Sequence, residues 1–419
     1  MTTLDSLARE YIAESFSLDP LEATNAGIHD HDGRWPDWTS EGIARRLDFV
    51  RHWTGRLEAL TERELTLDEA IDRDRLLLDL GDRAYEARFA ADAWDPMTWV
   101  YRLGDGLFTL LSREFAPPAD RLASFAGRLE GVPAVVAAAK ARLTSGAAGV
   151  PVSRFHTDIA LRNLAGIEDL IAEGLGLADT NATDPRVEAL RARLDSAAAG
   201  ARAAMTDFHD FLRHTVLPTA DGEGRLGPER FAERLVHAFS DPTMTPARVL
   251  AAAEAQYPLV RAEMARLARA LWSAWCADRP EPAADDEAVR AVLAAISTDH
   301  PPAAELLDTC RAELGRIEQF CRDRHVIGLS DEPLQIQWTP TFLRNFAGAM
   351  LHSPGPFDRG QKAFFSVTPP NDAWPPERVE SFLREHHRRQ LTLLTIHEAV
   401  PGHYLQGVYG NRAPSLVRQ

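Results

Sequence analysis

The chain has 419 residues, of which 45% are hydrophobic and 26% are charged, so it can bury a large core. This composition excludes intrinsic disorder and collagen-like structure. The net charge of −16 disfavours nucleic acid and anionic membrane surfaces as partners, and we expect neither.

Cys276, Cys310 and Cys321 are odd in number and form no CxxC pair, which argues against a disulfide framework and a structural zinc knuckle. Residues 1–14 contain acids and lack the apolar run of a signal peptide. No later stretch approaches about 18 uninterrupted apolar residues. We therefore expect a cytoplasmic protein, and the oligomeric state stays open.

Most of the sequence carries apolar residues three or four positions apart, which predicts a mainly α fold. Clear examples are 122–136, 187–212 and 307–321. The most linker-like segment is 279–287, which is rich in proline and acids. It is expected to follow an N-terminal helical region, 1–278, and to precede an active-site region, 288–419, within one continuous structural unit.

Two segments predict a small β-sheet. Leu334–Trp338 alternates polar and apolar residues, and 363–368 is aromatic and β-branched. Because Pro369 and Pro370 follow directly, the second segment suits an edge strand, whose outer N–H and C=O groups are free to pair with another chain.

The candidate chemistry lies in a helix predicted from Pro375 and Pro376 to about Val400. One face can be traced through apolar residues and two histidines, and it places His397 inward. This face contains Val379, Leu383, His386, Gln390, Leu394 and His397.

His397, Glu398 and His403 form the central motif, within the string HEAVPGHYLQ. Two neutral imidazoles can bind Zn²⁺, which lowers the pKa of bound water, and a neighbouring glutamate can accept the proton. In the common HExxH motif the second histidine is four residues on. Here it is six on, which at about 100° per residue leaves it about 120° off the helical face.

Pro401 and Gly402 offer a way to meet this spacing. Pro401 lacks the N–H that would continue the helix, and Gly402 permits backbone angles closed to other residues. A bend here could bring His403 back towards His397. The motif therefore favours metal chemistry over a structural histidine pair, provided that both rings face a common point.

Other candidates have weaker support. His29 and His31 lie in a polar loop beside glycine, which favours a solvated loop over a ligand set. His386 lies about 16 Å from His397 along a helix, so it is expected at the core or rim rather than as a ligand of the same ion. Tyr404 is expected to pack. The sequence contains no GxSxG elbow, P-loop or GxGxxG motif ahead of a helix.

With these residues in view, the chain resembles the bacterial domain-of-unknown-function 885 family. HEAVPGHYLQ from His397, the SPGPFD turn from Ser353 and FFSVTPP from Phe364 carry the resemblance, which extends weakly over nearly the whole chain. It implies a zinc-peptidase-like protein similar in fold to the helical gluzincins. That fold is a multi-helix bowl with a small sheet bordering an active-site cleft.

The resemblance also implies roles for individual residues. His397 and His403 would bind Zn²⁺, Glu398 would be the general base, and a short peptide or amide substrate would add to the strand at 364–368. These strand residues are Phe364, Phe365, Ser366, Val367 and Thr368.

The family pattern continues to a further helix whose glutamate supplies a third ligand, whereas no Asp or Glu follows His403 here. We therefore expect a truncated chain with low metal occupancy and little or no activity. The alternatives are a catalytically silent helical protein that binds peptides or serves as a scaffold, and a metal-dependent amidase for non-peptide substrates.

Overall fold

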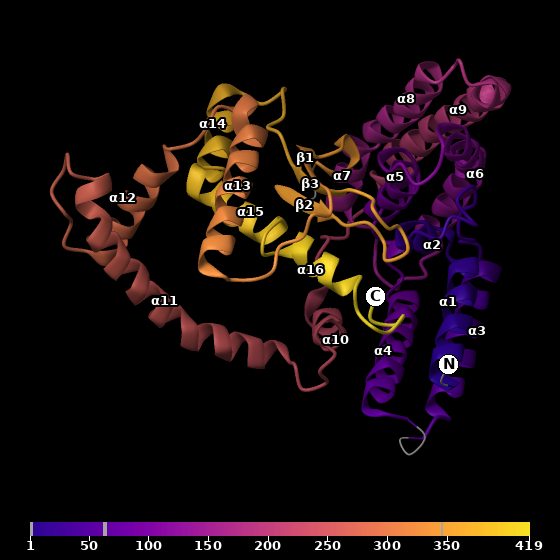
Figure 1. Ribbon diagram of the computed structural model, residues 1–419, viewed down its shortest axis with the longest axis horizontal. Helices are drawn as coiled ribbons and strands as arrows, with labels where there is room; N and C mark the ends of the chain where they lie inside the picture. The colour runs from indigo at the N-terminus through magenta and orange to yellow at the C-terminus, as the bar shows by residue number, and fades with distance from the viewer. Residues whose placement is uncertain (1–2, 62–64, 345–346) are drawn as a thin grey trace.

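Helices make up most of the protein, and a small mixed β-sheet lies among them (Figure 1). The computed structural model describes residues 3–61, 65–344 and 347–419. The expected mainly α architecture with a small sheet is thus confirmed.

The N-terminal part is a helical bundle with two apolar cores. Its first helices are α1 (Thr3–Leu18), α2 (Pro20–Ala26), α3 (Ser40–Glu58) and α4 (Leu67–Phe89). After a short 3₁₀ turn, η2 (Ala91–Ala93), come α5 (Met97–Ser112), α6 (Pro118–Thr144), α7 (Arg154–Asn163), α8 (Ala165–Thr180), α9 (Pro185–Phe211) and the π-helical turn η3 (Leu212–Val216). The first core joins α1, α3 and α4, and the larger one joins α5 to α9.

Helix α6 lies at the centre of the larger core. Its predicted stripe, which includes Leu122, Phe125 and Leu129, is fully buried, and the helix packs along α9. By length and composition alone α6 is also apolar enough to cross a membrane, and half of its most apolar stretch is buried inside the protein. A core helix of a soluble protein has the same properties, so this finding is weak support for a membrane span.

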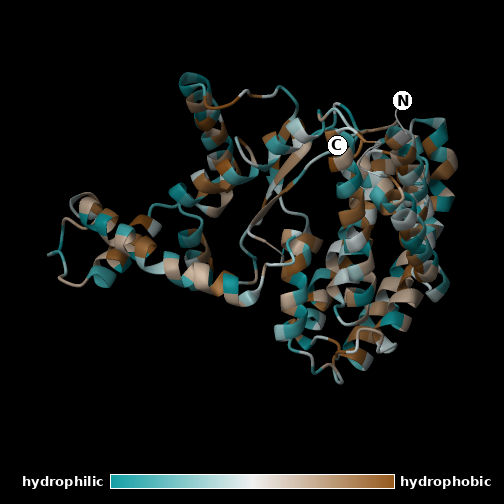
Figure 2. Ribbon diagram, turned by 90° about the horizontal axis from the view of Figure 1, so that it is seen from below, coloured by the Kyte–Doolittle hydropathy of each residue, from teal (hydrophilic) through white to brown (hydrophobic). Residues whose placement is uncertain are grey.

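Helices α10 (Gly227–Phe239), α11 (Pro246–Trp275) and α12 (Asp285–Ser297) follow, and α11 and α12 extend from the body as an arm (Figures 1 and 2). Trp272 and Cys276 at the end of α11 pack against Val289 and Val292 of α12. The segment 279–287, expected as a linker, therefore includes the turn of a helical hairpin and the start of α12.

The sheet lies between the N-terminal bundle and the last helices. After η4 (Ala303–Glu305) the elements are α13 (Leu306–Arg324), β1 (Leu334–Trp338), η5 (Thr341–Leu343), β2 (Ala349–His352), β3 (Ala363–Val367), α14 (Pro376–Glu385), α15 (Arg388–Glu398) and α16 (His403–Gly410). Strand β3 is central: it pairs parallel with β1, Leu334 opposite Ala363, and antiparallel with β2, Ala349 opposite Val367.

Two expectations are corrected by this arrangement. The edge position expected for 363–368 is wrong, because β3 pairs with β1 on one side and with β2 on the other. The single helix expected from Pro375 to about Val400 is interrupted, since α14 ends at Glu385 and α15 starts at Arg388. His387 precedes α15, where its Nδ1 accepts a hydrogen bond from the Gln390 N–H at 3.3 Å.

Candidate functional site

The helix breaks between Glu398 and His403, where the Pro-Gly pair predicts it. Helix α15 ends at Glu398, and α16 begins again at His403. A Cβ on Gly402 would lie 1.9 Å from the carbonyl oxygen of His397, so only glycine allows this close return of the chain.

The break brings the two imidazoles of the motif together. The Nε2 atoms of His397 and His403 lie 3.1 Å apart, with the ring planes at 88°. In a tetrahedral zinc centre with bonds of 2.0–2.1 Å, two ligand nitrogens are separated by about 3.3 Å. The pair thus has the spacing of two ligands of one cation, although a hydrogen bond from one ring to the other also satisfies this distance.

Both rings are exposed, so the inward position expected for His397 is wrong. Adjacent residues on a helix point about 100° apart, and here it is Glu398 that points into the protein. Within the described residues no cluster of three or more His, Cys, Asp or Glu side chains is arranged to hold a metal ion. Among the described residues, the possible metal ligands at this motif are therefore the two imidazoles of His397 and His403.

Glu398 connects the motif to the sheet. Its side chain is buried, and burial raises the pKa of the carboxyl, while the nearby His397 and His403 and the backbone N–H of Leu351 oppose that shift. Leu351 lies on β2, so the carboxylate accepts a hydrogen bond from the outer edge of the sheet. A carboxylate beside two imidazoles, out of bulk water, is suited to proton transfer.

A groove of about 400 Å³ adjoins the motif and follows the start of β2 and the face of α15. Its lining comprises Gly348, Ala349, Glu385, His386, Gln390, Leu393, Leu394, His397 and Glu398. His386, expected at the core or rim, is buried and lines this groove. Its Nδ1 lies 2.9 Å from the carbonyl oxygen of Phe382, and its ring stacks on that side chain.

The strand residues implied as a substrate platform lie elsewhere. Phe364, Phe365, Ser366, Val367 and Thr368 are all buried. Phe365 packs towards α13 and α15, whereas Phe364 faces the opposite side and lies under the guanidinium of Arg113. With both neighbours paired and both faces covered, β3 cannot pair with a further chain. That part of the prediction is corrected, and β2 takes the edge position beside Glu398.

Other residues considered from the sequence have structural partners. His29 bridges Asp32 and Asp358, with ring nitrogens 2.8 and 3.4 Å from the two carboxylates. Tyr404 is buried and donates to the carbonyl of Glu332, as expected for a packing residue. Sequence reasoning missed Leu351, and no signal in the short segment AMLH distinguishes it as a strand.

The structure therefore defines a mainly helical protein with a His-Glu and His pair at a helix break, set beside the edge of a small sheet. Residues 20–419 match a family described as "Bacterial protein of unknown function (DUF885)", and the chain belongs to this family. The resemblance recognised in the sequence is thus confirmed.

Two solved structures are similar over nearly the whole chain. A candidate lipoprotein of unknown function from Shewanella oneidensis has a TM-score of 0.74 and 27% identity, covering 100% of this chain and 74% of that one. A candidate lipoprotein from Colwellia psychrerythraea has a TM-score of 0.64 and 13% identity, covering 98% and 74%. The second likeness concerns the fold alone. A search of curated proteins finds no match.

Proposed function

We propose that the protein is a zinc-dependent hydrolase of the gluzincin type, acting on peptide bonds of short peptides. The observation that supports this best is the approach of the His397 and His403 Nε2 atoms to 3.1 Å beside the buried carboxylate of Glu398. Zinc held by the two imidazoles would act as a Lewis acid and lower the pKa of a bound water to about 7.

The chain's own residues divide the remaining work. The Glu398 carboxylate accepts the proton of the attacking water and later donates it to the leaving amine. The Leu351 N–H fixes the orientation of that carboxylate from β2. A group held in this way needs little reorganisation when the proton moves, which favours catalysis.

The outer edge of β2 is the place where an extended substrate would bind. The Thr368 N–H donates to the Gly348 carbonyl, so from the next residue on the backbone groups of alternate residues of β2 face β3. By this alternation the backbone groups of Ala349 and Leu351 point away from β3. The Leu351 N–H is used by Glu398, so the Ala349 N–H and the carbonyls of both residues are the groups left for a substrate. Ala349 also lines the groove beside Glu398, which supports strand addition there in place of 364–368.

The first experiment measures zinc rather than turnover. We expect H397A and H403A each to lower zinc affinity at least tenfold, measured by competition with a chromophoric chelator, because each variant leaves a single imidazole. H214A, at an exposed histidine outside the site, is the matched control. Equal zinc affinity in the native protein and all three variants would refute the metal site.

The second experiment tests the base. E398Q keeps the size of the side chain but cannot accept a proton, so it should retain zinc and lose hydrolysis of a fluorogenic peptide by about 100-fold or more. Full turnover in E398Q would overturn the role given to this carboxylate.

A silent peptide-binding protein is the second candidate, and the set of only two histidine ligands among the described residues favours it. Two protein ligands hold zinc less firmly than the three of a catalytic site, so low occupancy and weak activity are expected. Saturable peptide binding without cleavage at full zinc loading would support this candidate. Cleavage of non-peptide amides in preference to peptides would instead favour an amidase.

Location is likewise a proposal. Three free, buried cysteines agree with a reducing compartment and hence the cytoplasm. The two similar structures are described as candidate lipoproteins. A lipid anchor of that kind attaches a protein to a membrane, which is the alternative location. Fractionation of the native cells with an antibody to this protein separates the two locations.

A further inference from the structure

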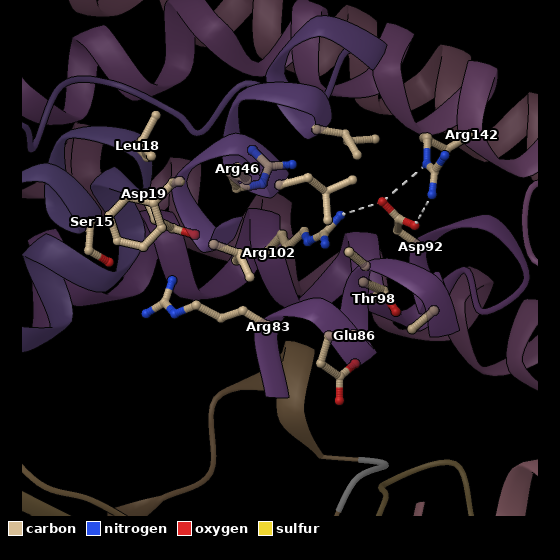
Figure 3. Close-up of a pocket in the computed structure, with 16 residues that line it drawn as sticks. Ser15, Leu18, Asp19, Arg46, Arg83, Glu86, Asp92, Thr98, Arg102 and Arg142 are labelled. Carbon is tan, nitrogen blue, oxygen red and sulfur yellow. Dashed lines mark hydrogen bonds and ion pairs between the residues drawn. The ribbon is translucent and has the colours of Figure 1, made fainter. Parts of the chain in front are cut away.

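The N-terminal bundle contains a cavity of about 270 Å³ that the proposed hydrolase does not use. Helices α1, α3, α4 and α5 supply most of its lining (Figure 3). Every lining residue falls between Ser15 and Arg142, so none belongs to β2, α15 or α16. The cavity is thus separate from the groove at His397.

Arginines are prominent in this cavity: Arg46, Arg83, Arg102 and Arg142 all line it. Two of them are matched by carboxylates. Arg142 donates to both oxygens of Asp92, at 2.7 and 3.2 Å. Arg83 donates to Asp79 at 2.8 Å and to Glu22 at 2.9 Å. These two guanidinium groups have their partners within the protein.

Arg46 and Arg102 have weaker carboxylate partners than the other two arginines. Arg102 stacks on Trp38 and Trp99 and reaches Asp92 only at 3.4 Å. Arg46 donates to a backbone carbonyl, and no ion pair joins it to a carboxylate in the described part of the chain. Burial lowers the pKa of both arginines. Since a guanidinium carries five N–H donors, both side chains retain donors for an anion.

The other carboxylates of the lining are already engaged. Asp19 caps α2 and accepts the backbone N–H groups of Leu21 and Glu22, at 3.0 and 3.1 Å. Glu86 pairs with Arg234 of α10. Both carboxylates therefore have hydrogen-bond or ion-pair partners, and the charge of Asp19 also acts on Arg46 and Arg102 without a direct ion pair among the described residues.

The rest of the cavity wall combines one buried polar side chain with apolar ones. Ser15 lines the cavity and is only 3% exposed, and its hydroxyl has no hydrogen-bond partner among the described residues. Much of the remaining wall is apolar and includes Leu18, Ile43, Leu47, Phe49 and Val50.

We propose that this cavity binds a small amphiphilic carboxylate, such as a medium-chain fatty acid. Its carboxylate lies between Arg46 and Arg102, and its aliphatic body packs against the side chains of α1 and α3. Guanidinium groups bind carboxylates in a planar, two-pronged geometry, and a desolvated site strengthens that contact. The volume lies just below the usual range for small-molecule pockets, which suits a short ligand.

The test uses the full chain and three probes in isothermal titration calorimetry: octanoate, octanamide and inorganic phosphate. Octanamide has the same aliphatic body without the charge, and phosphate has charge without the body. We expect saturable binding of octanoate, at least tenfold tighter than either of the others. Equal binding of octanamide would overturn the role of the arginines, and equal binding of phosphate would overturn the amphiphilic ligand.

Variants then locate the site. R46Q keeps hydrogen-bond donors but removes the charge, and it should weaken octanoate binding at least tenfold. R51Q, at an arginine whose side chain is 68% exposed outside the cavity, should bind as the native protein does. Unchanged affinity in R46Q would refute the proposal. Should R46Q fail to fold, the three-probe comparison on the native chain still decides whether a charged amphiphile binds.

Discussion

The ion-paired position of His29 makes a testable prediction about stability and pH. The ring lies between Asp32 and Asp358 and stacks on Phe115 with centroids 3.7 Å apart. The approach depends on Gly27, where a Cβ would lie 2.4 Å from the backbone nitrogen of Asp358. His29 therefore holds the end of α2 to a turn more than 300 residues later in the chain.

The direction of the pH dependence of stability follows from the pKa of His29. Burial alone would lower it, but the hydrogen bonds and charges of Asp32 and Asp358 prevail and raise it to about 9, against an ordinary value of 6.5. A group whose pKa is raised on folding stabilises the protein fully below its unfolded value. The contribution is thus complete below about pH 6.5 and is lost as the pH rises through 9.

The size of this contribution to the free energy of unfolding follows from the same two pKa values. At about 1.36 kcal/mol for each pH unit, the difference sets an upper bound of roughly 3 kcal/mol. Because 26% of the His29 side chain is exposed, solvent screening reduces this, and we expect about 2 kcal/mol.

The assay is equilibrium urea unfolding of the native protein and H29Q at pH 6, 7.5 and 9.5. The native protein should exceed H29Q by about 2 kcal/mol at pH 6, and the difference should shrink towards pH 9.5. Subtracting the unfolding free energy of H29Q from that of the native protein at each pH removes the contribution of other titrating groups. H214Q is the control, since it changes an exposed histidine. Parallel curves for native protein and H29Q would refute the ion-pair reasoning.

Three further substitutions test the fold and the site. R128M should lower the free energy of unfolding by about 3 kcal/mol or more, because the fully buried guanidinium donates to three backbone carbonyls. A melting temperature within about 2 °C of the native value would contradict this. G402A should lower zinc affinity at least tenfold, because the added Cβ forces the turn away from His397. The control is G410A, where a Cβ meets nothing within 4 Å, and it should leave the affinity unchanged. Equal affinities in the two variants would reject the role of the turn. F365A should lower the free energy of unfolding in urea by about 3–5 kcal/mol, because Phe365 is fully buried on the central strand β3. L393A, at an exposed residue, should change it little. A loss below about 1 kcal/mol in F365A would count against a central β3.

Local chemistry explains which elements the sequence could predict. The stripe through Leu122, Phe125 and Leu129 repeats over many turns, and such a period is compatible with only one buried face. The Pro401 and Gly402 pair likewise acts on the backbone itself, so the break could be expected from two residues. The cavity at Arg46 could not, because its lining combines separate helices and the sequence does not contain their distances.

The two errors at the candidate site have one physical cause. Strand β2 is four residues long and carries no alternation, so only its pairing with β3 defines it. Without β2, the sequence predicts 363–368 at the edge of the sheet and places no hydrogen-bond donor beside α15. The apolar stripe alone then favours His397 as the inward residue. Once β2 is present, the Leu351 N–H gives the Glu398 carboxylate a buried partner, and His397, about 100° round the helix, must face outward. The exposed ring is then free to meet His403 across the turn. The edge strand therefore determines which member of the His-Glu pair is buried.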